Sequence, residues 1–320
     1  MQHEVSSRAN AIRELGLERY ALDLEADGVT VVPPEVHGVP IEAFDAMSAW
    51  LLQRAEALVG CRFTIEHGPD AELTFERDAP RLGQRGGPPN QFIFQKLASL
   101  HRMFRDLAIN PVAVALIRYM IGARDTRFSS HHAFLKWQGE YGYGPNLGMH
   151  CDQIASPLPW GRAALTANTN WCLTDYTREG GAFAYVPASH RTVSRPTFPE
   201  AVERAVPVIA PKGSVIVFHG ATWHGAFPRT IPGMRLMIAN YYRHMHTLPQ
   251  EDIRNSFPRD LADDCDAPTQ FKMLAGFSDM WPYSTEFERL PMLVDPPPAN
   301  NASTPPDYWA STADRRSLRG

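Results

Sequence analysis

Apolar residues recur at helical spacing through much of the first 125 residues. The segment 41–59 (IEAFDAMSAWLLQRAEALV) is amphipathic, and apolar positions three and four apart also occur over 5–25 and 97–121. Pro111 and Gly122 are typical of a helix start and a helix end, so they divide the last segment in two. The pattern predicts helices over 5–25 and 41–59, two helices within 97–121, a short strand over 29–32 and a Gly/Pro-rich loop over 66–91.

The pattern changes near residue 127 to short apolar or alternating runs, separated by Gly, Pro and Asn. Regularly spaced short strands are typical of an all-β barrel or sandwich. We expect one domain over 1–290, mainly β with flanking helices, in which the helical part (1–125) packs outside a β core (about 127–245); residues 291–320 are expected to form a Pro-rich polar tail. The predicted strands cover 131–138, 164–173, 181–187, 205–210, 213–219 and 234–243.

Composition narrows the class of protein. The chain has 320 residues, 44% apolar and 21% charged, with a net charge of −4, which is typical of a globular protein with a sizeable core. It has no cluster of Lys and Arg that would indicate nucleic-acid binding, and no apolar run of the roughly 18 residues that a membrane helix needs. The polar, acid-containing N-terminus does not resemble a secretory signal, and four widely spaced cysteines indicate a reducing compartment, by default the cytoplasm.

The stretch GMHCDQ (148–153) contains a possible pair of metal ligands. On an extended strand, His150 and Asp152 point to the same face, because side chains alternate with a period of two. Two imidazoles and one carboxylate can hold a first-row metal with open coordination positions. His224, 72 residues after Asp152, is the candidate third ligand. An H-x-D pair alone is common by chance, and a structural histidine is the alternative.

Arg235, eleven residues after His224, lies among apolar residues in a predicted strand. A guanidinium buried there needs an anion, which is either a bound carboxylate or phosphate or an internal Asp or Glu. Arg229 is the rival position, although its Pro-containing loop favours a solvated side chain. His219 is the rival metal ligand, while the remaining histidines in this region are expected to have structural or surface roles: His190, His244 and His246.

Taken together, these residues resemble the phytanoyl-CoA dioxygenase family of iron(II)- and 2-oxoglutarate-dependent oxygenases. The resemblance covers roughly 20–245. The motifs that carry it are His150-Cys151-Asp152, NWCLTDYTREGGAFAYVPASHR (170–191) and GSVIVFHGATWHGAFPRTIPGMR (213–235), with a weaker match in YALDLEADGVTVVPPEV (20–36). It implies a double-stranded β-helix core, also called a jelly-roll or cupin-like core.

The resemblance also implies roles for individual residues. His150, Asp152 and His224 would bind Fe(II), and Arg235 would bind the distal carboxylate of 2-oxoglutarate. Trp171 and Gln95 are expected near that co-substrate. A hydroxyl that some relatives carry two residues after the distal histidine is absent, because Ala226 stands there; Thr169 and Ser214 are candidate replacements.

The implied reaction consumes O₂ and 2-oxoglutarate and releases succinate and CO₂, with ascorbate as the reductant in vitro. Related halogenases have Ala or Gly at the carboxylate position, so Asp152 favours oxygenation. Hydroxylation is the default outcome, while desaturation, ring closure and endoperoxide formation would use the same residues.

A small hydrophobic molecule is the expected substrate, because aromatic residues surround the H-x-D segment. No phosphate or CoA cradle is recognisable. Gln153 would orient Asp152 or face the substrate, and Cys151, by alternation, would point away from the metal. The other candidate lining residues are Trp137, Tyr141, Tyr143, Trp160 and Trp223.

Three alternatives stay open at this level. One is a barrel that binds a metal or small molecule without catalysis. Another is a zinc hydrolase that uses the same triad with an activated water. The third is a cupin-type oxygenase that needs no 2-oxoglutarate. The substrate and the oligomeric state do not follow from the sequence.

Overall fold

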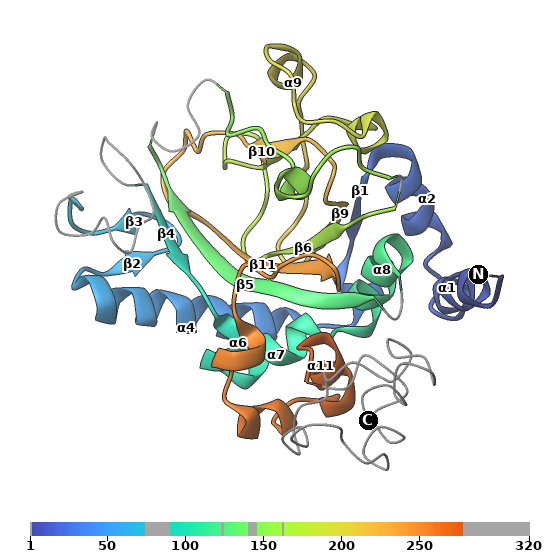
Figure 1. The fold of residues 1–320 in the computed structure, drawn as a ribbon. Coiled ribbons are helices and arrows are strands. Elements are labelled where there is room, and N and C mark those ends of the chain that lie inside the picture. Colours follow the sequence, from blue (N-terminus) through green and yellow to red (C-terminus); the bar gives the residue numbers. More distant parts are fainter. Residues whose placement is uncertain (1, 74–89, 123–124, 140–145, 162, 278–320) are drawn as a thin grey trace, which may run out of the picture.

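The computed structural model describes residues 2–73, 90–122, 125–139, 146–161 and 163–277 (Figure 1). Its chain begins with two helices, α1 (Gln2–Glu14) and α2 (Glu18–Asp27), where the sequence predicted one. Gly16 adopts a left-handed φ of 64°, and Leu17 N donates to Ile12 O at 2.8 Å, as at many helix C-termini. The second helix then begins directly after Leu17, whose side chain is buried.

The next helices largely follow the predicted pattern. Helix α4 (Ile41–Val59) and helix α8 (Pro111–Ile121) have the expected bounds, and the Asn110 side chain caps α8 by accepting from Ala113 N at 3.1 Å. The expected helix before α8 is instead two short ones, α6 (Leu97–Leu100) and α7 (Arg102–Ala108). His101 separates them because its backbone is extended, with φ −155° and ψ 148°.

Two antiparallel sheets make the β core, a double-stranded β-helix as predicted. The major sheet has the order β1-β9-β6-β11-β5-β4, and the minor sheet has the order β10-β7-β8. The strands of the major sheet are β1 (Val29–Val32), β9 (Val215–His219), β6 (Thr166–Cys172), β11 (Met234–His244), β5 (Thr126–Trp137) and β4 (Gln91–Phe94). Those of the minor sheet are β10 (His224–Ala226), β7 (Phe183–Tyr185) and β8 (Val206–Pro207).

Short elements complete the described chain. They are α3 (Pro34–His37), the hairpin β2 (Phe63–Thr64) and β3 (Gly68–Pro69), η1 (Asp152–Ala155), η2 (Ser189–Thr192), α9 (Glu200–Glu203), α10 (Ile253–Ser256), η3 (Arg259–Asp263) and α11 (Pro268–Leu274). No helix in the described ranges is both long and apolar enough to cross a membrane. The expected tail, 291–320, lies outside those ranges.

Side-chain alternation gives the major sheet one core face and one cavity face. Helices α4, α6, α7 and α11 lie on one side of this sheet, and β10 and α9 lie on the other (Figure 1). On β6, Trp171 faces the helices and contacts Phe44 of α4, with ring centroids 6.2 Å apart. Its neighbours Asn168 and Asn170 line the cavity on the opposite face.

A bulge between β5 and β11 connects the core to the cavity. Tyr241 pairs with Ser130, but the next residue, Tyr242, pairs with Phe128, so Ser129 is the extra residue. Ser129 O accepts from Glu251 N at 2.8 Å, and Ser129 Oγ accepts from Gln250 N at 3.0 Å. The bulge thereby holds the chain that follows β11 beside the cavity.

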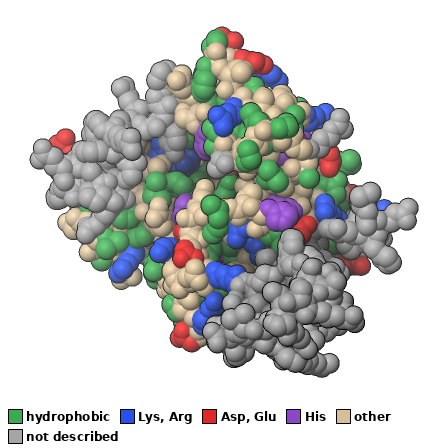
Figure 2. All heavy atoms as spheres, in the orientation of Figure 1, with side chains coloured by type: hydrophobic (Ala, Val, Ile, Leu, Met, Phe, Trp, Pro, Cys, Tyr) green, Lys and Arg blue, Asp and Glu red, His purple; other side chains and the backbone are tan. Residues whose placement is uncertain are grey.

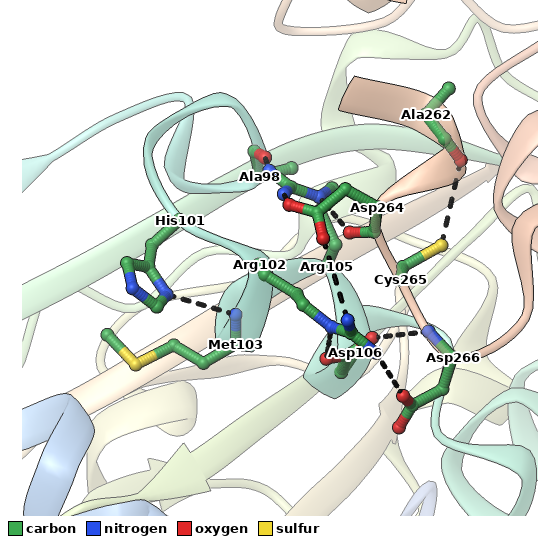
Figure 3. Close-up of polar contacts among 10 residues, drawn as sticks. All are labelled: Ala98, His101, Arg102, Met103, Arg105, Asp106, Ala262, Asp264, Cys265 and Asp266. Carbon is green, nitrogen blue, oxygen red and sulfur yellow. Dashed lines mark hydrogen bonds and ion pairs between the residues drawn. The ribbon is translucent and has the colours of Figure 1, made fainter. Parts of the chain in front are cut away.

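Arg105 on α7 anchors the C-terminal part of the described chain (Figure 3). This side chain is 2% exposed and donates to Ala98 O at 2.8 Å, to Asp264 O at 2.8 Å and to the Asp264 carboxylate. Arg102, one turn earlier, is 49% exposed and forms ion pairs with Asp106 and Asp266. The buried guanidinium should stabilise the fold more than the exposed one, because water competes less for its partners.

We predict that Arg105→Met lowers the free energy of unfolding by about 2–3 kcal/mol, since buried carbonyls lose their donor. Arg102→Met is the matched control and should cost clearly less. Urea denaturation followed by circular dichroism measures both. Equal losses in the two variants would contradict the role assigned to Arg105.

Candidate active site

A cavity of about 400 Å³ lies between the two sheets. Strands β4, β5, β6, β9 and β11 of the major sheet line it, together with β7 and β10 of the minor sheet and the segment that contains His150. Figure 2 shows one face of the molecule, on which histidine side chains lie among hydrophobic ones. The cavity wall is mixed: its larger apolar residues are Phe134, Phe183, Phe218 and Met237, and its polar residues include Gln91, Ser130, His132, Asn168, Asn170 and Gln250.

His150, Asp152 and His224 come together at this cavity. His150 and His224 form a backbone bridge in which each N–H donates to the other carbonyl at 2.8 Å. Asp152 follows at the start of η1, and its carboxylate lies 3.6 Å from His150 Nε2 and 3.5 Å from His224 Nε2. One potential ligand atom from each residue lies within 4.8 Å of the others, which fits a single ion.

Hydrogen bonds prepare both imidazoles for metal binding. His150 Nδ1 lies 2.7 Å from Gly148 O, and His224 Nδ1 lies 2.9 Å from Thr222 O. A carbonyl can only accept, so each Nδ1 carries a proton, and each Nε2, which faces Asp152, is the atom left to coordinate a metal. Burial is the main reason that the pKa of His224 falls to about 4, so this ring is neutral at pH 7. Two imidazoles beside a carboxylate are the donor set of the facial triad.

Neighbouring polar groups hold Asp152 in its charged form. Burial alone would raise the pKa of this carboxyl, but His224, His150 and a hydrogen bond from Asn168 Nδ2 keep the pKa below its usual value. The Tyr241 hydroxyl donates to Asp152 O at 3.0 Å and fixes the backbone. A carboxylate oriented in this way is ready to coordinate a cation.

Arg235 lies in the same cavity, 2% exposed. Its Nη1 donates to Gly181 O, and its guanidinium carbon lies 5.3 Å from the centre of the Tyr176 ring. Its Nε has no hydrogen-bond partner among the residues that the structure describes. No Asp or Glu in the described ranges forms an ion pair with it, so the internal-acid alternative has no candidate there. A buried cation that faces a cavity in this way suits an anionic ligand.

Comparisons with known proteins agree with this geometry. The sequence profile of the phytanoyl-CoA dioxygenase family matches residues 25–237. The chain belongs to the phytanoyl-CoA dioxygenase family. This family contains iron- and 2-oxoglutarate-dependent oxygenases, the class of oxidoreductase that the sequence motifs indicated.

Individual relatives match this chain at low sequence identity or over only part of its length. The dioxygenase af480 of Aspergillus fumigatus is 29% identical over 179 residues, which are 55% of this chain and 56% of that protein. The chain thus matches little more than half of that relative's length. The uncharacterized protein Rv1501 of Mycobacterium tuberculosis is 32% identical over 77 residues, 24% of this chain and 28% of that protein. Among solved structures, the chain is similar to the epimerase SnoN in complex with Fe3+, alpha ketoglutarate and nogalamycin RO. The two sequences are 20% identical. The TM-score is 0.51, and the match covers 72% of this chain and 84% of SnoN. At this identity, the structural likeness supports the fold alone.

Two residues expected at the co-substrate lie elsewhere in this family member. Trp171 is fully buried on the helix-facing side of β6, against His37 and Phe44. Gln95 is exposed after the end of β4 and does not line the cavity. Gln91, four residues earlier on β4, does line it. The sequence could not set the phase of β6, and a shift of one residue exchanges the two faces of a strand.

The expected substrate-contacting residues are mostly part of the core. Trp137 packs against Phe63, and Trp223 donates to Ser194 O at 2.9 Å in a second apolar cluster that also contains Trp160. Gln153 is fully buried and accepts from Leu165 N at 3.0 Å, so its side chain positions a loop. Tyr141 and Tyr143 lie outside the described residues.

The rival and replacement residues also have other surroundings. Thr169 and Ser214 are buried and do not line the cavity, so neither replaces the missing hydroxyl. Arg229 is buried and not solvated as expected, because it donates to the carbonyls of Gly180, Pro232 and Gly233. Cys151 points into an apolar cluster. The other histidines named above lie apart from the triad. The rings of His190 and His219 contact each other, and His244 pairs with Asp125. All four cysteines are free and buried.

The sequence reasoning missed a polar set on the cavity wall. Ser130 donates to Gln250 Oε1 at 2.6 Å, and His132 Nε2 lies 3.3 Å from the buried Glu251 carboxylate. Lys96 N and His131 N also donate to this carboxylate. The period-two pattern of β5 placed Ser130, His132 and Phe134 on one face, but only the bulge brings Gln250 and Glu251 beside them.

We predict that Asp152→Ala weakens iron(II) binding by more than the roughly 10- to 100-fold that loss of an outer-shell partner costs, because it removes a ligand. His246→Ala, at an exposed histidine outside the triad, is the control and should bind iron normally. Anaerobic titration calorimetry with Fe(II) measures both. Unchanged iron affinity in Asp152→Ala would remove this residue from the metal site.

Proposed function

We propose that this family member is an iron(II)- and 2-oxoglutarate-dependent oxygenase that hydroxylates a C–H bond of a small organic molecule. The observation that carries the proposal is that the His150–Asp152–His224 triad and the buried Arg235 lie in one cavity. A triad alone suits several metals and reactions. A cationic group beside it, with no acidic partner in the described ranges, suits a co-substrate that carries a carboxylate.

The protein's own residues bind and orient the reactants. His150, Asp152 and His224 would hold the iron, and the carbonyls of Gly148 and Thr222 would keep both Nε2 atoms directed at it. When bound, iron supplies the oxygen chemistry, in which one oxygen atom of O₂ ends in succinate and the other in the hydroxyl group. Asp152 keeps the coordination position that halogenases leave for halide, which supports oxygenation.

The cavity wall favours a substrate of mixed polarity over the hydrophobic one that the sequence suggested. Phe134, Phe183 and Phe218 offer apolar contact. Ser130 and His132, held by Gln250 and Glu251, offer hydrogen bonds. A partly hydroxylated ring compound has both features.

Arg235 also distinguishes the proposal from its alternatives. A zinc hydrolase that uses the triad with an activated water would not require a buried cation in the cavity. A cupin-type oxygenase that works without 2-oxoglutarate would not require one either. Loss of Arg235 should therefore affect 2-oxoglutarate use only if the proposal is correct.

We predict that Arg235→Leu raises the 2-oxoglutarate concentration needed for half-maximal succinate formation by about 10- to 100-fold, the range expected for a lost charge-assisted hydrogen bond. The assay contains Fe(II), ascorbate and O₂. Arg204→Leu, at a half-exposed arginine paired with Glu200, is the control and should resemble the wild type. Unchanged 2-oxoglutarate dependence in Arg235→Leu would contradict the clamp, and absence of succinate in the wild type with every ring compound tried would contradict the oxygenase itself.

A further inference from the structure

Lys136 lies beside Arg235 on the major sheet. These two residues are direct partners in the β5–β11 ladder, and Lys136 is also the partner of Gln91 in the β4–β5 ladder. Directly paired residues of antiparallel strands extend from the same face of a sheet. Arg235 and Gln91 both line the cavity, and Lys136 extends between them from the same face of the sheet, although its own side chain does not line the cavity. Its side chain is completely buried, with 0% exposed.

The two cationic groups reach neighbouring stretches of backbone. Lys136 Nζ donates to Phe227 O at 3.3 Å, and Arg235 Nη1 donates to Gly181 O. These two carbonyls belong to backbone segments that lie side by side, because Phe227 N donates to Ala182 O at 2.9 Å. The ammonium and the guanidinium therefore lie close together, next to the part of the cavity that Arg235 lines.

Positive charges gathered in a buried space repel one another unless an anion reaches them. Burial, then repulsion from Arg235 and Arg229, lowers the pKa of Lys136 to about 6. Neither arginine forms an ion pair with any Asp or Glu that the structure describes. A carboxylate placed between Lys136 and Arg235 would favour the charged form of both side chains.

The co-substrate site also lacks one donor. Ala226, two residues after His224, lines the cavity with a methyl group where some relatives carry a hydroxyl. We propose that Lys136 is the missing contact and that, together with Arg235, it binds the distal carboxylate of 2-oxoglutarate. This inference rests on the proposed function. Arg235 would supply a planar pair of donors, and Lys136 a compact ammonium from the neighbouring strand.

The test compares two ligands that differ only in the distal carboxylate, namely 2-oxoglutarate and 2-oxopentanoate. Their affinities for the full-length, Fe(II)-loaded protein are measured by anaerobic calorimetry. Lys136→Met keeps the length of the side chain but removes its charge. Lys272→Met, on α11, is the control, because Lys272 pairs with Asp263 at the surface. Lys136→Gln replaces Lys136→Met if circular dichroism shows that the latter is unfolded.

We expect Lys136→Met to reduce the preference for 2-oxoglutarate over 2-oxopentanoate by about 10- to 100-fold, through weaker 2-oxoglutarate binding alone. Lys272→Met should keep the wild-type preference. An unchanged preference in Lys136→Met, or an equal loss of affinity for both ligands, would overturn the inference. If instead the wild type binds neither ligand or does not distinguish them, the proposed function fails.

Discussion

The candidate active site depends on one backbone pair, the reciprocal hydrogen bonds between His150 and His224. These residues are far apart in the sequence, and neither belongs to the major sheet. The bridge joins their main chains, so both imidazoles start from fixed positions, with ring centroids 4.3 Å apart. Asp152 follows in η1, and Asn168 and Tyr241 of the major sheet then hold it from the opposite wall. The metal site is thus a junction between the two sheets.

Side-chain alternation in the major sheet places the apolar core on one face and the polar groups of the candidate active site on the other. One face of β5, β6 and β11 packs against the helices through residues such as Leu135, Trp171 and Ile238, all almost completely buried. The other face carries the polar and charged groups of the cavity. A one-residue change of register would exchange these sets, so the apolar core also fixes which side chains meet the ligand. The bulge at Ser129 is the one place where β5 departs from this alternation, and there the chain after β11 joins the cavity wall.

The sequence was sufficient where the chemistry or a local signal is specific. The bounds of α4 and α8 follow from apolar spacing, Pro111 and the glycines after each helix. His150, Asp152, His224 and Arg235 stood out because few other reasons explain such residues at such spacing. The sequence does not show which face of β6 each residue occupies. Trp171 was therefore expected to contact the co-substrate, and Asn168 and Asn170 were not predicted to line the cavity. Lys136 passed unnoticed for a related reason, since only the pairing of β5 with β11 places it beside Arg235.

We propose that the triad and the cationic groups beside it together bind iron(II) and 2-oxoglutarate. The most direct measurement is an anaerobic titration of 2-oxoglutarate into the iron(II)-loaded protein, followed by visible absorption. Chelation of iron(II) by a 2-oxo acid produces a charge-transfer band, so we expect a band that saturates at one equivalent of 2-oxoglutarate per iron. A protein that binds iron but develops no such band would contradict the account.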